Sequence, residues 1–101
     1  MLNKNIMKQA QELQARLAKA QEELGNETVE ASSGGGMVTV VVDGHQNFRS
    51  IKIKPEAVDP EDISLVEDLV LAAVNEGLKR SQELVSKRMS ALTGGLKLPG
   101  M

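Results

Sequence analysis

The sequence contains no cysteine, no tryptophan and no tyrosine, and it has only one histidine and one phenylalanine. Without cysteine the chain forms no disulfide and offers no thiolate to a metal or a substrate, which fits a reducing compartment. With one aromatic residue, Phe48, the core has to be aliphatic. The same scarcity disfavours binding of single-stranded nucleic acid, because such binding relies on stacking of bases on aromatic rings.

Long apolar runs are also missing. The first residues, MLNKNIMKQAQELQ, lack the continuous apolar stretch of a signal peptide, and nowhere do 18 apolar residues follow one another. We therefore expect a soluble, cytoplasmic protein. A length of 101 residues is typical of one domain, and we expect a single domain over residues 1–101.

Charge is unevenly distributed along the chain. The formal net charge is only -2, but residues 55–78 carry seven acidic and no basic residues, whereas residues 79–101 carry five basic residues and one acidic residue. This placement says more about partners than the mean charge does.

The N-terminal segment shows the spacing of an amphipathic helix over about residues 3–24. Its apolar residues recur every three or four positions, and Gly25 and Asn26 follow as stop signals. They are Ile6, Ala10, Leu13, Leu17, Ala20 and Leu24. Lys4, Lys8 and Lys19 fall opposite this stripe, and taken alone they fit an ordinary solvated helix face.

The middle of the chain predicts three β-strands, over about residues 27–32, 36–43 and 47–54. Residues 37–42 are rich in β-branched side chains, and Asp43-Gly44 begins a turn signal before the last strand. We expect an antiparallel meander, with Phe48 in its packing.

A second long helix is predicted over about residues 60–92, followed by a tail over residues 93–101. The acidic residues Glu61 and Asp62 suit the positive end of a helix. The first half is apolar around most of its circumference, as in a helix buried against a sheet or a partner chain. In the second half, the basic residues fan across the side opposite the apolar one: Lys79, Arg80, Lys87 and Arg88.

Three consecutive glycines, Gly34 to Gly36, raise the possibility of a phosphate-binding loop. Such a loop follows a strand, opens a helix and supplies a lysine followed by Ser or Thr. Here the glycines lead into a strand, and no lysine follows until Lys52. We therefore expect the glycines to let the chain turn sharply as it enters the second strand.

Catalytic residues are not expected. The one histidine, His45, lies in the predicted hairpin turn, and the paired acids near residues 61–68 have a helix-dipole explanation and no positioned partner. We expect no enzyme activity, no metal site and no cofactor. A small-molecule substrate is not expected either.

Binding of duplex DNA suits the basic helix face better, because duplex DNA is gripped mainly through its phosphates. A dimeric protein–protein interaction scaffold, with incidental affinity for DNA, remains the alternative. Dimerisation itself has a physical reason. A chain of this size cannot easily cover both the first helix's stripe and the apolar segment over residues 63–74.

Four blocks in order, covering nearly the whole chain, resemble the YbaB/EbfC family of bacterial nucleoid-associated proteins. They are MKQAQELQ at Met7–Gln14, the G-x-V-x-V-x-x-x-G pattern at Gly36–Gly44, EDL-x-x-AA-x-N at Glu67–Asn75, and M-x-x-x-TGGL at Met89–Leu96. The family's last strand often ends in Asp-Pro, where this chain has Lys54-Pro55.

The resemblance implies an α+β fold: an α-β-β-β-α protomer with a three-stranded antiparallel sheet and two long helices, forming a tweezer-like homodimer. It also implies a protein of the nucleoid that binds duplex DNA with limited sequence specificity, organises the nucleoid and in some cases affects transcription. The DNA contacts implied lie on the first and last helices, at Lys4, Lys8, Arg16, Lys19, Lys79, Arg80, Lys87 and Arg88.

Overall fold

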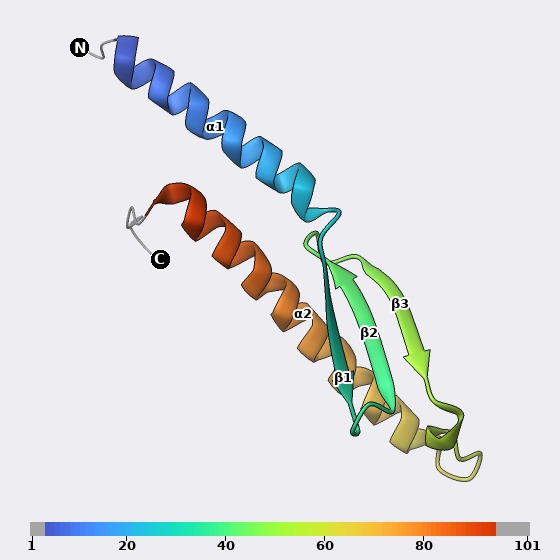
Figure 1. Cartoon of the computed structure of the whole chain (residues 1–101). Coiled ribbons are helices and arrows are strands. Elements are labelled where there is room, and N and C mark those ends of the chain that lie inside the picture. Colours follow the sequence, from blue (N-terminus) through green and yellow to red (C-terminus); the bar gives the residue numbers. More distant parts are fainter. Residues whose placement is uncertain (1–3, 95–101) are drawn as a thin grey trace.

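A computed structural model describes residues 4–94 of the chain (Figure 1). The elements run in the order α1 (Lys4–Leu24), β1 (Thr28–Ser33), β2 (Val38–Asp43), β3 (Phe48–Ile53), a 3₁₀ turn η1 (Pro55–Ala57) and α2 (Ile63–Thr93). Two helices and an antiparallel sheet of three strands confirm the predicted α+β fold. The tail over residues 95–101 lies outside the described residues.

The sheet has the order β1-β2-β3, and α2 packs along one of its faces (Figure 1). Directly paired residues of antiparallel strands point to the same face, so Ala31, opposite Val40, shares the helix-covered face with it. The buried core consists of Ala31, Val38, Val40 and Ala73, with Phe48, Leu69, Val70 and Val74 packed against it. The core is aliphatic apart from Phe48, as the composition predicts.

Small residues let α2 approach the central strand closely. Ala73, Gly77 and Ser81 are spaced four residues apart on α2 and are all buried. A Cβ atom added at Gly77 would lie only 2.9 Å from Val40 Cγ2. One turn further on, Ser81 Oγ donates a hydrogen bond of 2.7 Å to the backbone oxygen of Asp43, so the helix is also tied to the end of β2.

The glycine run closes the hairpin between β1 and β2. Gly34, Gly35 and Gly36 have φ angles of 60°, 67° and 92°, in the left-handed region that side-chain-bearing residues avoid. The turn is closed by a hydrogen bond of 3.1 Å from the Gly36 N–H to Ser33 O. Three glycines are therefore used because three successive residues take positive φ, and the run serves as a turn before β2.

The second helix begins later than its acidic residues suggest. Pro60 and Glu61 precede α2, and Asp62 is its N-cap residue, so the first turn carries no acid. The N–H of Glu61 donates to Asp59 Oδ1 and the N–H of Asp62 to Asp59 O, both at 2.9 Å, which holds the chain in a turn. The expectation that Glu61 and Asp62 lie within the helix start is thus corrected.

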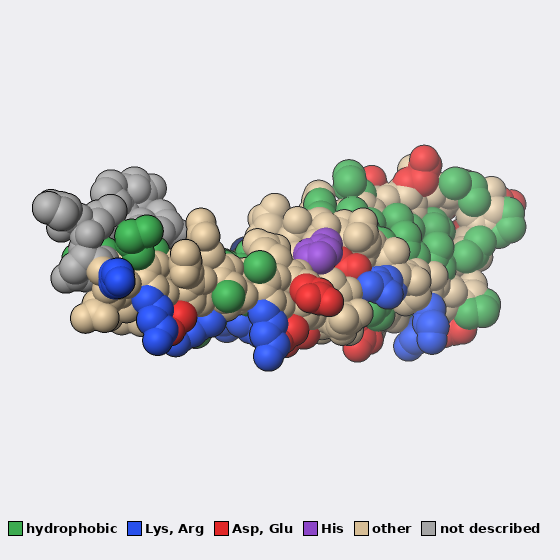
Figure 2. Space-filling view, turned by 90° about the horizontal axis from the view of Figure 1, so that it is seen from above, with side chains coloured by type: hydrophobic (Ala, Val, Ile, Leu, Met, Phe, Trp, Pro, Cys, Tyr) green, Lys and Arg blue, Asp and Glu red, His purple; other side chains and the backbone are tan. Residues whose placement is uncertain are grey.

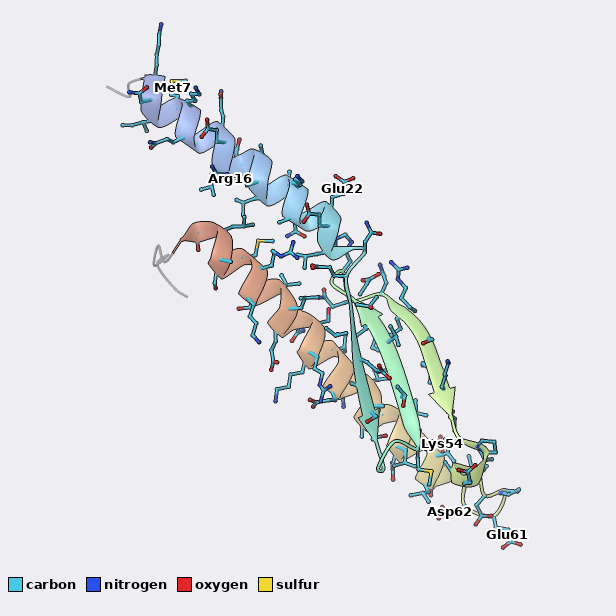
Figure 3. The ribbon with its side chains drawn as sticks, in the orientation of Figure 1. Met7, Arg16, Glu22, Lys54, Glu61 and Asp62 are labelled. Carbon is cyan, nitrogen blue, oxygen red and sulfur yellow. The ribbon has the colours of Figure 1, made fainter. Side chains whose placement is uncertain are left out.

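The protomer is long and narrow, with extents of 71 × 25 × 16 Å. Its radius of gyration is 19.4 Å, against about 13 Å for a compact domain of this length. The cause is visible in Figure 1: α1 projects beyond the sheet, on the same side as the end of α2. Met7 and Arg16 lie on this projection, whereas Lys54, Glu61 and Asp62 lie at the opposite end (Figure 3).

Candidate nucleic-acid interface

The projecting helix α1 carries half of the basic residues expected to contact DNA. Ala20 and Leu24, in its last turns, are buried, and Leu13 and Leu17 are partly buried, which turns this side of the helix toward the body. Lys4, Lys8, Arg16 and Lys19 are all exposed. Helical spacing places Lys4, Lys8 and Lys19 on the side of α1 opposite Leu13 and Leu17, and Arg16 between the two sides.

Residues from both helices meet in one cleft, which no sequence pattern predicts. Arg16 and Lys19 of α1 and Arg88 of α2 line it together with Ala20, Glu23 and Leu92. Its volume is about 160 Å³. Three of the predicted bases are thereby brought together from positions far apart in the chain.

On α2 the predicted bases differ in what they already bind. Lys79 and Lys87 are exposed. The Arg80 guanidinium donates to Glu30 O at 2.7 Å and pairs with Glu76 Oε1 at 3.3 Å, although about half of its side chain remains exposed, at 51%. Arg80 and Lys87 also line a hollow between β1 and α2 together with Glu30 and Glu83.

Of the eight predicted bases, Arg88 is the least exposed, and it pairs with two carboxylates. Its Nη1 lies 3.1 Å from Glu23 Oε2, and its Nη2 is paired with Glu27 Oε1. Only 27% of its side chain is exposed. The sequence places Arg88 on the same face as its basic neighbours, but the structure binds its guanidinium to two carboxylates.

The hairpin between β2 and β3 holds the C-terminal end of α1. The sequence did not predict this role for the hairpin. His45 Nε2 is 2.5 Å from Gln21 O, and the Gly44 N–H donates to Leu24 O at 2.9 Å. A Cβ atom at Gly44 would lie 2.6 Å from Leu24 O, so only glycine permits this approach. His45 is thus a turn residue, as predicted, whose ring also binds the last turn of α1.

A buried carboxylate organises the same hairpin. The Asp43 side chain is 1% exposed; its Oδ1 accepts from the N–H groups of His45 and Asn47, and its Oδ2 from Arg49 Nε at 2.9 Å. The bond from Asn47 and the interactions with Arg49 and His45 hold the pKa of Asp43 below its ordinary value of 3.8, although burial acts in the opposite direction. This arrangement is structural, and the Asp-Gly-x-x-Asn spacing was its only sequence signal.

Figure 2 shows how these groups lie on the surface. Lys and Arg side chains gather along one edge of the half that contains the helix ends, interspersed with acids, and hydrophobic side chains gather over the half that contains the sheet. Over residues 4–94, no group of three or more His, Asp or Glu side chains could hold a metal ion. No helix within that range is long and apolar enough to cross a membrane.

Comparison with known proteins decides the family. The model of the YbaB/EbfC DNA-binding family matches residues 1–96. The chain belongs to the YbaB/EbfC DNA-binding family. The resemblance seen in the four sequence blocks is thereby confirmed, and the family is one of DNA-binding proteins and is not known for enzyme activity.

Several proteins named nucleoid-associated protein are similar to this chain over most of their length. A nucleoid-associated protein of Pelotomaculum thermopropionicum is 53% identical over 96 residues, which cover 95% of this chain and 91% of the relative. Nucleoid-associated proteins of Desulforamulus reducens and Bacillus thuringiensis are 56% and 54% identical, covering 91% and 88% of those relatives and 95% of this chain.

A solved structure shares the fold. The crystal structure of an uncharacterized protein from Helicobacter pylori superposes with a TM-score of 0.77 at 19% identity, covering 93% of this chain and all of that chain. At this identity the likeness concerns the fold alone.

Proposed function

We propose that this protein binds duplex DNA as a homodimer, through the basic faces of α1 and of the C-terminal half of α2, with limited sequence specificity. In this role it acts at the nucleoid, in the cytoplasm, where it contributes to nucleoid organisation and to gene regulation. Family membership supports the DNA-binding part, and the names of the relatives support the nucleoid.

The observation that carries the proposal is the segregation of charge along the molecule. Seven of the eight predicted bases are exposed on α1 and on the second half of α2. Residues 55–78, which have seven acids and no bases, include the opposite end of the molecule, where Glu61 and Asp62 lie (Figure 3). A polyanion is therefore attracted to the helix ends and repelled from the far end.

The homodimer is supported by apolar surface that one protomer leaves uncovered. Ile51 pairs with Val40 and Ile53 with Val38, so both lie on the face of the sheet that α2 covers, yet they are 48% and 40% exposed. Leu71 on α2 is 60% exposed. It lines an apolar hollow of about 410 Å³ with Val66, Glu67, Val70 and Val74.

Contiguous exposed apolar patches of this kind mark interfaces, and a twofold pairing covers the same patch on both copies. Sedimentation at micromolar concentration should therefore give a dimer. A stable folded monomer at that concentration would contradict this part of the proposal.

Binding to DNA should depend on salt in proportion to the phosphates contacted. If about four to six phosphates are neutralised per dimer, the logarithm of the affinity should fall against the logarithm of salt concentration with a slope of roughly -4 to -5. Unrelated duplexes should bind with similar affinity. Gel retardation across a salt series, with duplex competitor, measures both.

A charge-reversal pair tests the proposed face. Lys79→Glu with Lys87→Glu reverses two exposed lysines of α2, whereas reversing Arg80 or Arg88 would also break the ion pairs described above. Lys52→Glu with Lys54→Glu makes the same change of charge at two exposed residues, and Lys54 lies at the end of the molecule opposite α1 (Figure 3). The first variant should no longer retard duplex DNA but should remain a dimer. The second variant should keep most of the DNA affinity of the unmodified protein. Equal loss in both would refute the helix-face assignment.

A further inference from the structure

One guanidinium spans the junction where α1 meets the sheet. Arg88 lies in the last part of α2, Glu23 is next to the end of α1, and Glu27 follows the turn that leads into β1. Arg88 Nη1 donates to Glu23 Oε2 at 3.1 Å, and Nη2 donates to Glu27 Oε1. The planar fork of arginine can hold two carboxylates at once, which a lysine ammonium cannot do in a fixed geometry.

We propose that Arg88 is a positioning residue, which fixes the angle between α1 and α2 and thereby the spacing of their basic faces, and that it is not itself a DNA contact. This inference rests on the proposed function, since the spacing matters because both helices contact the same duplex. It also reassigns one of the eight bases predicted from the sequence.

Other anchors hold the C-terminal end of α1. Leu24 is fully buried and Ala20 is 4% exposed, while His45, Gly44 and Arg49 bind the backbone oxygens of Gln21, Leu24 and Gly25. This end of α1 is the pivot about which the rest of the helix can rotate. At the same end, the pair of Arg88 with Glu23 ties α1 directly to α2, and so opposes rotation of one helix relative to the other.

Small rotations at the pivot have large effects at the far end. The 21 residues of α1 span about 31 Å at 1.5 Å per residue, so a rotation of about 10° moves the tip by about 5 Å. A displacement of that size exceeds the length of a hydrogen bond and would misplace Lys4 and Lys8 relative to the bases of α2. Control of this angle is therefore control of the DNA-binding surface.

The local charges argue against a phosphate contact by Arg88. A phosphate bound to Arg88 would lie beside two carboxylates that already neutralise this guanidinium, and both would repel it. Glu27 depends on the pairing, since within residues 4–94 its Oε2 is buried and has no hydrogen-bond partner. Releasing Arg88 would leave this carboxylate partly buried and uncompensated.

The two roles predict different outcomes for one variant. Glu23→Gln with Glu27→Gln leaves Arg88 in place and makes the chain more positive by two charges. If Arg88 contacts phosphate, this variant should bind duplex DNA at least as tightly as a variant with the same change of charge elsewhere. If Arg88 positions α1, it should bind about fivefold more weakly than that charge-matched variant, the scale of two partly exposed ion pairs.

The matched control is Glu12→Gln with Glu22→Gln, which makes the same change of charge at two exposed acids of α1. Glu22 lies on the side of α1 away from α2 (Figure 3). The control should tighten binding through charge alone. Tightening of the Glu23/Glu27 variant equal to or greater than that of the control overturns the proposal.

A second measurement needs no DNA. Because the sequence has no cysteine, Gln14→Cys on α1 and Ser86→Cys on α2 give a unique pair of spin labels in the full chain, diluted with unlabelled chain so that distances within one protomer are read. Arg88→Gln and the Glu23/Glu27 variant should each broaden or shift the distance distribution by several ångström, and the Glu12/Glu22 control should not. An unchanged distribution in both overturns the positioning role, whereas failure of the unmodified protein to bind DNA would overturn the proposed function alone.

Discussion

Replacing Gly77 with alanine should destabilise the protein, although alanine is the better helix former. In a helix interior the exchange is worth about 1 kcal/mol in favour of alanine. At this position the new Cβ would lie 2.9 Å from Val40 Cγ2 and 3.4 Å from Phe48 Cε2, whereas carbon atoms in contact prefer about 3.5–4.0 Å. The two effects therefore oppose each other.

The steric effect should dominate. Val40 is fully buried on the central strand, so it cannot turn its Cγ2 aside without entering other core atoms. Overpacking of this kind costs about 1–3 kcal/mol, and the close contact with a buried side chain of the sheet places Gly77→Ala toward the upper part of that range. After the helix gain, we expect a net loss of about 1–2 kcal/mol in the free energy of unfolding. The midpoint of thermal unfolding should fall by about 5–10 °C.

A second background isolates the contact. Val40→Ala removes Cγ2, so adding Gly77→Ala there should stabilise the protein by up to about 1 kcal/mol, the helix term alone. Urea denaturation followed by far-ultraviolet circular dichroism, at one fixed protein concentration, gives all four free energies. The reasoning is refuted if Gly77→Ala has the same effect in both backgrounds or stabilises the chain that retains Val40.

Two further predictions concern the hairpins. Because the pKa of Asp43 in the folded protein lies below its ordinary value of 3.8, its stabilisation is present above that value and is lost as pH falls through the lower folded-state pKa. The unmodified protein should lose this contribution to urea resistance between about pH 5 and 2, and Asp43→Asn should show a flatter profile over the same range; parallel profiles would contradict it. In the glycine turn, Gly35→Ala should cost about 1–2 kcal/mol, because φ is +67° and alanine pays for the left-handed conformation there. Gly34→Ala should cost more, because its Cβ would also lie 2.7 Å from Leu69 Cδ2. If urea denaturation shows the same loss of unfolding free energy for Gly34→Ala and Gly35→Ala, the steric contact with Leu69 does not contribute.

Much of the fold was predictable because its elements depend on local patterns. The apolar spacing from Ile6 to Leu24 and the alternation in residues 48–54 are set by helix and strand geometry. The start of α2 was harder to predict from the sequence, because the turn at Asp59 competes with the helix for the same acidic residues. The close approach at Gly77 was not predictable, since the glycine lies inside a helical pattern and its reason is a strand far away in sequence.

The candidate site was likewise predictable only where it depends on local helix geometry. Helical spacing alone places Lys79 and Lys87 on an exposed face. It cannot show that Arg88 is engaged, because its partners Glu23 and Glu27 lie 65 and 61 residues earlier in the chain. Nor does it bring Arg16 and Lys19 into one cleft with Arg88, which depends on how α1 leaves the sheet.

Three of the arginines in residues 4–94 bridge two groups within the protein. The guanidinium groups of Arg49, Arg80 and Arg88 each join two sites: Asp43 and Gly25 O, Glu76 and Glu30 O, and Glu23 and Glu27. The five N–H donors of a rigid guanidinium suit such bridging. A lysine ammonium on a flexible stem suits contacts with the phosphates of a DNA backbone, which do not depend on base sequence. We therefore assign the salt-dependent contacts first to the exposed lysines and Arg16, and next to Arg80, whose side chain remains 51% exposed. Arg88 sets the angle between the helices on which those contacts depend.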